Sequence, residues 1–188
     1  EDGQSQCDRL LRSKYTCKDL GTLGFGENDS ESLHLLNRTV RRGRDDQGWF
    51  VELEPDPRHA LAIISEAGFK LDSKGSVTPR EKLKDEVVLA GQRMARLDKA
   101  EQTRYRSVVM RASYLAQDRA DLGETTKGLA RHMQAPTEAA LARLKRLGRY
   151  LIKYPSVVRS FSEQKVPERI RVFVDSDHAG CDVTRRST

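Results

Sequence analysis

Long apolar runs are absent from this chain of 188 residues. A helix that crosses a bilayer needs about 20 consecutive apolar residues, and no segment here approaches that length. The opening residues, Glu1 to Gln4, are acidic or polar, and no apolar core follows them as it would in a secretory signal. We therefore expect an intracellular protein with no membrane partner. The missing initial methionine suggests a segment of a longer protein.

Cysteine is scarce. Cys7, Cys17 and Cys181 are odd in number and widely scattered, which argues against a disulfide framework and favours a reducing compartment. A structural zinc site needs four clustered ligands. The nearest approach, His178 with Cys181, has no second pair to complete it, so we expect no metal–thiolate site.

Charge, by contrast, is plentiful and unevenly placed. The chain has 34 basic and 28 acidic residues, a net charge of +6. Residues 101–160 hold twelve Lys or Arg against five acids, so this stretch carries +7 and the remainder is close to neutral. A concentrated basic block is the electrostatic signature of a phosphate-binding surface. A solvated helical surface has the same composition, and composition leaves both interpretations open.

The first third of the chain shows strand signals after an ambiguous start. Residues 4–15 are compatible with a short helix, and the glycine-rich stretch after them breaks regular structure. Strands are predicted at 33–42 and at 49–53, and in the second of them Trp49, Val51 and Leu53 alternate with Phe50 and Glu52. The polar segment 43–48 between them suits a hairpin connection.

A helix signal follows the second strand. Asp56 is placed to cap the helix with its carboxylate, and Pro57 suits the first helical position because its missing N–H costs nothing there. Apolar residues recur at helical spacing up to Ala67, and Gly68 is a natural stop. The pattern predicts a helix between Pro57 and Gly68.

Residues 70–100 are charged and weakly patterned, which predicts a linker. Three helices are expected next, at about 105–116, 122–133 and 137–153, because apolar residues recur there at a 3.6-residue period. The third helix separates its side chains by kind. Apolar residues share one face, and four cations share the opposite face: Lys145, Arg146, Arg149 and Lys153.

This separation favours a ligand over simple solvation. Helix surfaces usually mix charges, because opposite charges at i and i+4 support the helix. Glu138 is the only acid between Pro136 and Ser162. We therefore give equal weight to two interpretations: the four cations contact phosphate, or they form a solvated surface.

The end of the chain combines strand patterns with carboxylates. A short strand is expected near 157–161, and residues 170–175 alternate like a second strand that ends in Asp175. Asp177, two positions later, would project to the same side if the extended conformation continued. Magnesium prefers oxygen ligands, and two-metal phosphodiester hydrolysis needs several carboxylates around the ions. An Asp-x-Asp after a strand is also an ordinary turn.

Several short motifs decide between these alternatives. In order and spacing they resemble the region of copia-type retrotransposon polyproteins that joins reverse transcriptase to ribonuclease H. They are Tyr105-Arg106-Ser107, Tyr114-Leu115-Ala116, Arg119-Ala120-Asp121-Leu122, Met133 with Pro136-Thr137, Leu144-Lys145-Arg146 with Arg149-Tyr150-Leu151, and Val174 to Cys181 with Thr184 to Thr188. The match is strong over 100–188 and weaker before residue 70. Ala120 stands where the family has proline, and His178 where it usually has tryptophan.

The resemblance implies an α+β fold and assigns successive parts of the chain to different domains. Residues 1–69 would be the primer grip and thumb of a reverse transcriptase, 70–100 a linker, 101–156 a helical connection, and 157–188 the start of a ribonuclease H domain whose strands lack their sheet partners. Asp175 would be its first catalytic carboxylate and a Mg²⁺ ligand, with Asp177 as a second metal ligand. The polymerase Tyr-x-Asp-Asp hairpin is missing, and Asp45-Asp46 lacks the surroundings to replace it.

The expected function is therefore that of a polyprotein segment. The parent would copy RNA into DNA and degrade the RNA strand, in a cytoplasmic particle or the nucleus. This segment would contact an RNA–DNA hybrid or a template–primer duplex, alongside the remainder of the polyprotein, and would be inactive alone. One alternative is a non-enzymatic basic helical module that binds nucleic acid, derived from such an element. Another is a helical interaction module without a nucleic-acid role.

Overall fold

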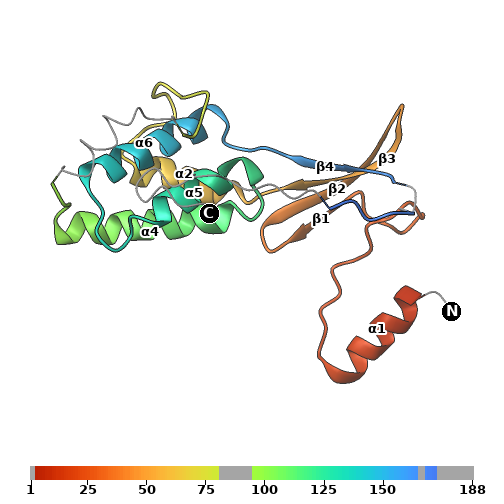
Figure 1. Ribbon diagram of the computed structural model, residues 1–188. Helices are drawn as coiled ribbons and strands as arrows, with labels where there is room; N and C mark the ends of the chain where they lie inside the picture. Colours follow the sequence, from red (N-terminus) through yellow and green to blue (C-terminus); the bar gives the residue numbers. More distant parts are fainter. Residues whose placement is uncertain (1–2, 81–94, 165–167, 173–188) are drawn as a thin grey trace.

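The computed structural model describes residues 3–80, 95–164 and 168–172. Its architecture is α+β, as the sequence predicts, with one antiparallel sheet and a group of packed helices (Figure 1). The elements in chain order are α1 (Gly3–Lys14), β1 (Ser32–Leu35), β2 (Arg38–Asp45), β3 (Gly48–Glu54), α2 (Pro57–Glu66), α4 (Lys99–Leu115), the 3-10 helix η1 (Ala120–Leu122), α5 (Gly123–Ala130), α6 (Glu138–Lys153) and β4 (Arg159–Ser162).

The strand predicted at 33–42 is two strands. Leu36 and Asn37 have positive φ angles of 51° and 63°, and the pairing of Leu35 with Arg38 closes a two-residue hairpin between β1 and β2. Two successive positive φ angles produce a tight turn whose twist matches that of the strands. The second hairpin turns at residues 46 and 47, inside the predicted segment 43–48.

β4 completes the sheet in the order β1-β2-β3-β4. It runs antiparallel to β3, with Phe161 opposite Val51. The expectation that this strand lacks a sheet partner is therefore wrong. The strand expected at 170–175 is not formed over its described part either, because residues 170–172 carry no regular structure and Ile170 is 91% exposed. No described strand lies beside them to pair with their backbone. Residues 173–175 lie outside the described part.

α2 forms where its local signals place it. The carboxylate of Asp56 accepts a hydrogen bond from the backbone N–H of Arg58 at 3.0 Å, and Pro57 occupies the first turn. Gly68 takes a φ of +85° just after the helix, a conformation that glycine adopts without a steric penalty. The predicted helix between Pro57 and Gly68 is confirmed.

The hydrophobic core lies among α2, α4, α5 and α6. The apolar stripes expected on the helices are buried there. The fully or nearly fully buried members are Ala60, Ile63, Ile64, Tyr105, Val108, Val109, Ala112, Leu115, Leu122, Leu129, Ala140, Leu144, Leu147 and Leu151. Each large aliphatic side chain buried in this way contributes roughly 2 kcal/mol.

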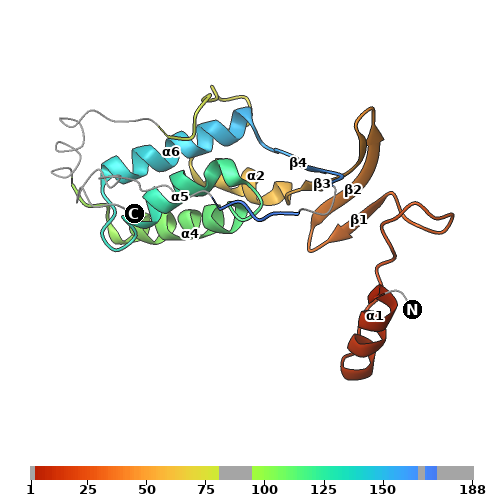
Figure 2. The same cartoon turned by 45° about the vertical axis from the view of Figure 1, so that its right-hand side comes forward.

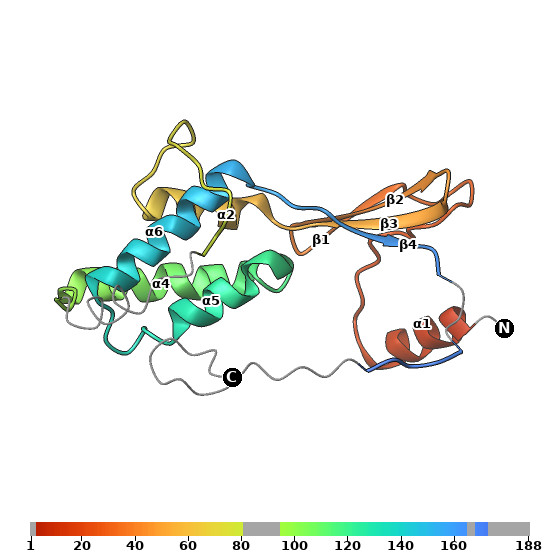
Figure 3. The ribbon, with the colours of Figure 1, turned by 45° about the horizontal axis from the view of Figure 1, so that its top comes forward.

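The sheet lies beside the helices instead of beneath them, and α1 stands apart from both (Figures 2 and 3). No residue of the four strands is buried. A bridge from β2 to the end of α4 joins the two parts, since Arg38 Nε donates to Asp118 Oδ2 at 2.6 Å with both side chains largely covered. No helix in the described ranges has the length and apolar character needed to cross a membrane.

Candidate nucleic-acid interface

α6 separates apolar from cationic side chains around its axis. Thr137 caps its first turn by accepting a hydrogen bond from the backbone N–H of Ala140. Leu144, Leu147 and Leu151 are buried among the other helices, as the 3.6-residue period predicts. The helix is therefore held by one face and presents the other outward.

The four cations predicted to bind phosphate lie on the outward face of α6. Lys145, Arg149 and Lys153 are exposed, and Arg146 is half-buried. Arg146 Nη2 donates to Thr78 Oγ1 at 2.9 Å. Among the described residues, no carboxylate forms an ion pair with Lys145, Arg149 or Lys153. The structure brings the predicted cations together along one helix and leaves three of them open to solvent.

Two of these cations lie near aromatic rings. The Arg149 guanidinium is 5.2 Å from the centre of the Phe69 ring. Lys153 Nζ is 5.6 Å from the centre of the Tyr154 ring. A cation held over a ring keeps its hydrogen-bond donors free for a ligand, because the contact uses the ring face and the charge only. These contacts place the cations without neutralising them.

The motif residues Tyr105 and Arg106 in the middle of α4 bind the segments that carry later motifs. Tyr105 Oη donates to the backbone oxygen of Leu129 at 2.8 Å, and burial raises the pKa of Tyr105 above its ordinary value. Arg106 Nε donates to the backbone oxygen of Met133 at 2.7 Å. Both side chains fix the path of the chain from α5 towards α6, so their role is structural.

Arg119 forms the centre of a buried network that sequence reasoning missed. Its guanidinium binds both carboxylate oxygens of Asp121, at 2.9 and 2.7 Å, and donates to the backbone oxygens of Tyr154 and Pro155. The hydroxyl of Tyr150 donates to Asp121 Oδ2 at 2.8 Å. The network joins the turn after α4 to the end of α6. Its only sequence signal is the shared motif pattern.

The carboxylate of Asp121 titrates under opposing influences. Burial raises its pKa, but the hydrogen bonds from Arg119 and Tyr150 outweigh burial and hold the pKa below its ordinary 3.8. Burial, together with the bond to Asp121, raises the pKa of Tyr150. Because the folded state favours ionised Asp121, its contribution to stability is complete above the unfolded pKa and is lost as pH falls through the folded value.

Replacement of Asp121 by Asn should therefore cost most at neutral pH. We expect a loss of about 2 kcal/mol there, the size of a hydrogen bond to a charged group, and a smaller difference from the original chain below about pH 3.8. Urea unfolding at a series of pH values measures the difference directly. A loss that stayed constant down to strong acid would mean that ionisation of Asp121 does not stabilise the fold.

The two expected magnesium carboxylates, Asp175 and Asp177, both lie outside the described residues. Within residues 3–80, 95–164 and 168–172, no group of three or more His, Cys, Asp or Glu is arranged to hold a metal ion. Asp45 and Asp46 are exposed at the β2–β3 turn. The roles of Asp175 and Asp177 stay predictions.

A second cationic surface, also missed from the sequence, lies on one face of the sheet. The Arg42 guanidinium is 4.6 Å from the centre of the Phe25 ring, and that of Arg44 is 4.8 Å from the centre of the Trp49 ring. Arg159 is 5.4 Å from the centre of the Phe161 ring. Alternation within β2 places Arg42 and Arg44 on the same face, but only the observed register shows which aromatic residues join them.

Comparison with known proteins gives one similar sequence. The chain is 32% identical over 179 residues to "Uncharacterized mitochondrial protein AtMg00810" of Arabidopsis thaliana, a match that covers 95% of this chain and 65% of the relative. The chain thus spans a little under two thirds of that relative's length. No family model and no solved structure matches the chain.

Proposed function

We propose that this chain is a segment of a copia-type retrotransposon polyprotein, from the end of its reverse transcriptase to the start of its ribonuclease H. In this role Lys145, Arg146, Arg149 and Lys153 contact the phosphates of an RNA–DNA hybrid or a template–primer duplex. The observation that carries the proposal is the outward face of α6, where these four cations lie together and three are exposed without an acidic partner among the described residues.

The support of α6 suits this role. Its opposite face is anchored in the core through residues such as Leu147, and Arg119 holds the chain at Tyr154 and Pro155 just beyond its end. A helix anchored in this way holds the backbone of its row of cations in a fixed arrangement, so binding to backbone phosphates has to order only the side chains. Hybrid duplexes are recognised mainly by shape and backbone, which requires no base-reading motif.

The other parts of the proposal follow from the sequence motifs. Asp175 would be the first carboxylate of the ribonuclease H site and, with Asp177, would bind Mg²⁺, whose chemistry there would be to stabilise the attacking oxygen of water and the leaving oxygen of the RNA strand. Two-metal hydrolysis would need further carboxylates beside these two. The second cationic surface, on the face of the sheet that carries Arg42 and Arg44, would lie near the primer end. The parent would act in a cytoplasmic particle or the nucleus.

A salt titration of binding to a short RNA–DNA hybrid tests the proposal. We expect log K to fall linearly with log salt concentration, with a slope of about −3 to −4 if all four cations release counterions from phosphates. Fluorescence anisotropy with a labelled hybrid measures both quantities. Absence of binding to the hybrid and to any other polyanion at low salt would contradict the proposal and favour a helical interaction module.

A further inference from the structure

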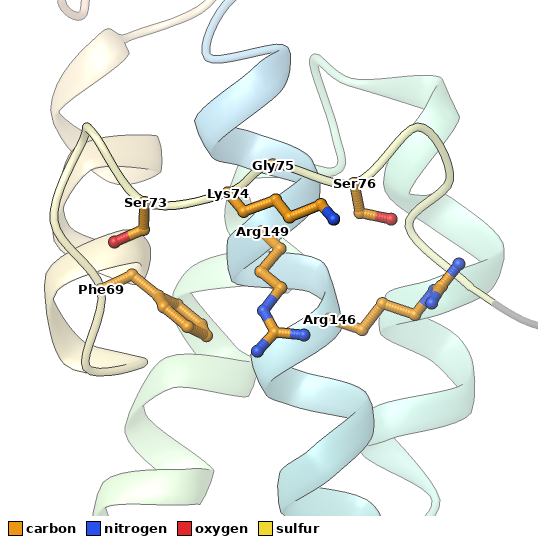
Figure 4. A pocket seen from close by; sticks show the side chains of 7 residues that line it. All are labelled: Phe69, Ser73, Lys74, Gly75, Ser76, Arg146 and Arg149. Atoms are coloured by element: carbon orange, nitrogen blue, oxygen red, sulfur yellow. The ribbon is translucent and has the colours of Figure 1, made fainter.

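Part of the cationic face of α6 and the loop after α2 line one cleft. Its volume is about 470 Å³, within the range of about 300–1,000 Å³ typical of small-ligand sites. The loop contributes Phe69 and residues 73–76 to its lining, and α6 contributes Arg146 and Arg149 (Figure 4). No acidic residue lines it.

The loop is held in place before any ligand arrives. The backbone N–H of Ser76 donates to the backbone oxygen of Arg149 at 3.0 Å. The hydroxyl of Ser76 donates to the backbone oxygen of Thr78, and Ser73 Oγ accepts from the backbone N–H of Lys70. Both serine side chains therefore brace the loop. A site with preformed geometry loses little entropy on binding.

Gly75 allows the loop to lie directly on α6. A Cβ atom at this position would lie 2.9 Å from Lys153 Cβ and 3.3 Å from the backbone oxygen of Arg149. The first distance is shorter than real Cβ contacts allow. A side chain at position 75 would therefore push the loop away from the helix and widen the cleft.

The cations of the cleft come from both of its walls. Lys74 and Arg149 are exposed, and Figure 4 shows both side chains on the same side of α6, with the Arg149 guanidinium beside the Phe69 ring. Neither cation has an acidic partner among the described residues. The ammonium of Lys74, from the loop, and the guanidinium of Arg149, from α6, line the same cleft, and both are donors that a phosphate group accepts from.

We propose that this cleft is a discrete binding site for a single phosphate group, held between Lys74 and Arg149 and bordered by Arg146. The phosphate would belong either to a nucleic-acid backbone or to a free nucleotide. The first source rests on the proposed function, whereas the site itself does not. Sequence reasoning assigned no functional role to Lys74, because it lies in the segment 70–100 that was predicted to be a linker.

Titration of the chain with inorganic phosphate, followed by ¹H–¹⁵N NMR, tests the site. We expect shifts at residues 74–76 and along α6 near Arg149. Lys74→Ala should weaken binding about tenfold, the value of one charge-assisted hydrogen bond. Lys127→Ala is the matched control, since Lys127 is exposed on α5 outside the cleft, and it should bind phosphate as the original chain does.

Gly75→Ala provides a second variant that keeps every charge. It should weaken phosphate binding at least as much as Lys74→Ala does, because it moves the loop and not the net charge. Neither Lys74 nor Gly75 belongs to the hydrophobic core, so thermal unfolding is expected to show that both variants fold. Two results would contradict the proposed site: the original chain does not bind phosphate, or both variants bind it as tightly as the original chain does. Either result would do so even if the chain still bound the hybrid duplex.

Two further ligands separate the sources of the phosphate. If the hybrid duplex supplies it, Lys74→Ala weakens hybrid binding and inorganic phosphate competes with the hybrid. If a nucleotide supplies it, adenosine monophosphate binds more tightly than inorganic phosphate and hybrid binding is insensitive to Lys74→Ala. Phosphate binding by a chain that binds no hybrid would support the cleft and contradict the proposed function, so the two failures are distinct.

Discussion

Replacement of Arg119 by methionine is expected to reduce the free energy of unfolding by about 3 kcal/mol, the lower end of the range for breaking a buried ion pair. The Arg119 side chain is 0% exposed, whereas that of Asp121 is 28% exposed. Solvent therefore compensates part of the lost pairing at Asp121. The backbone oxygens of Tyr154 and Pro155 would also lose their donor, and water reaches such covered groups poorly.

Chemical denaturation with a conservative series measures this effect. Arg119→Lys should recover little, since a single ammonium cannot bind two carboxylate oxygens and two carbonyls in the geometry of the guanidinium. Arg131→Met is the matched control: Arg131 is an exposed arginine at the end of α5, and the change should alter stability by no more than about 0.5 kcal/mol. Equal losses for the two methionine variants would show that the network does not stabilise the fold.

Neutralisation of the four cations of α6 should have the largest effect on binding. With Lys145, Arg146, Arg149 and Lys153 all changed to Gln, we expect the salt slope for the RNA–DNA hybrid to shrink by about 3 units. The same relation predicts a loss of roughly a thousandfold in affinity at about 0.1 M salt, because each phosphate contact contributes up to about 0.9 log units there relative to about 1 M.

A second quadruple variant separates the position of these charges from their number. Lys14, Lys18, Lys99 and Lys127 are exposed and belong to segments other than α6. Changing them to Gln lowers the net charge from +6 to +2, as in the α6 variant. We expect this control to keep most of the slope and affinity. Equal losses in both variants would show that net charge, and not the face of α6, attracts the duplex.

Elements with local causes were predictable from the sequence. α2 begins at Asp56 and Pro57 because capping and ring geometry act within one helical turn. α6 has the predicted apolar and cationic faces because a 3.6-residue period alone places Leu147 and Arg149 on different sides. The cation cluster of the candidate interface was predictable for the same reason.

Features that depend on distant pairing were not predictable. The sequence contains no sign that β4 would pair with β3, about a hundred residues earlier, because an edge strand with free backbone groups accepts any partner that the rest of the fold brings to it. The turn at Leu36 and Asn37 was missed because leucine is uncommon at positive φ. The placement of residues 73–76 on α6 depends on Gly75, which fits against Lys153 and Arg149. Those two residues are distant in the sequence, so the residues around Gly75 do not reveal the contact.

The sequence by itself determined which segments become helices, where α2 starts, and which cations of α6 share a face, since these follow from interactions between residues a few positions apart. Only the tertiary structure decided that Arg119 is buried beside Asp121 and Tyr150, that Lys74 and Arg149 line one cleft, and that Arg42 and Arg44 lie by aromatic rings. Burial and facing charges arise when separate elements pack together, and periodicity along one element carries no information about its neighbours.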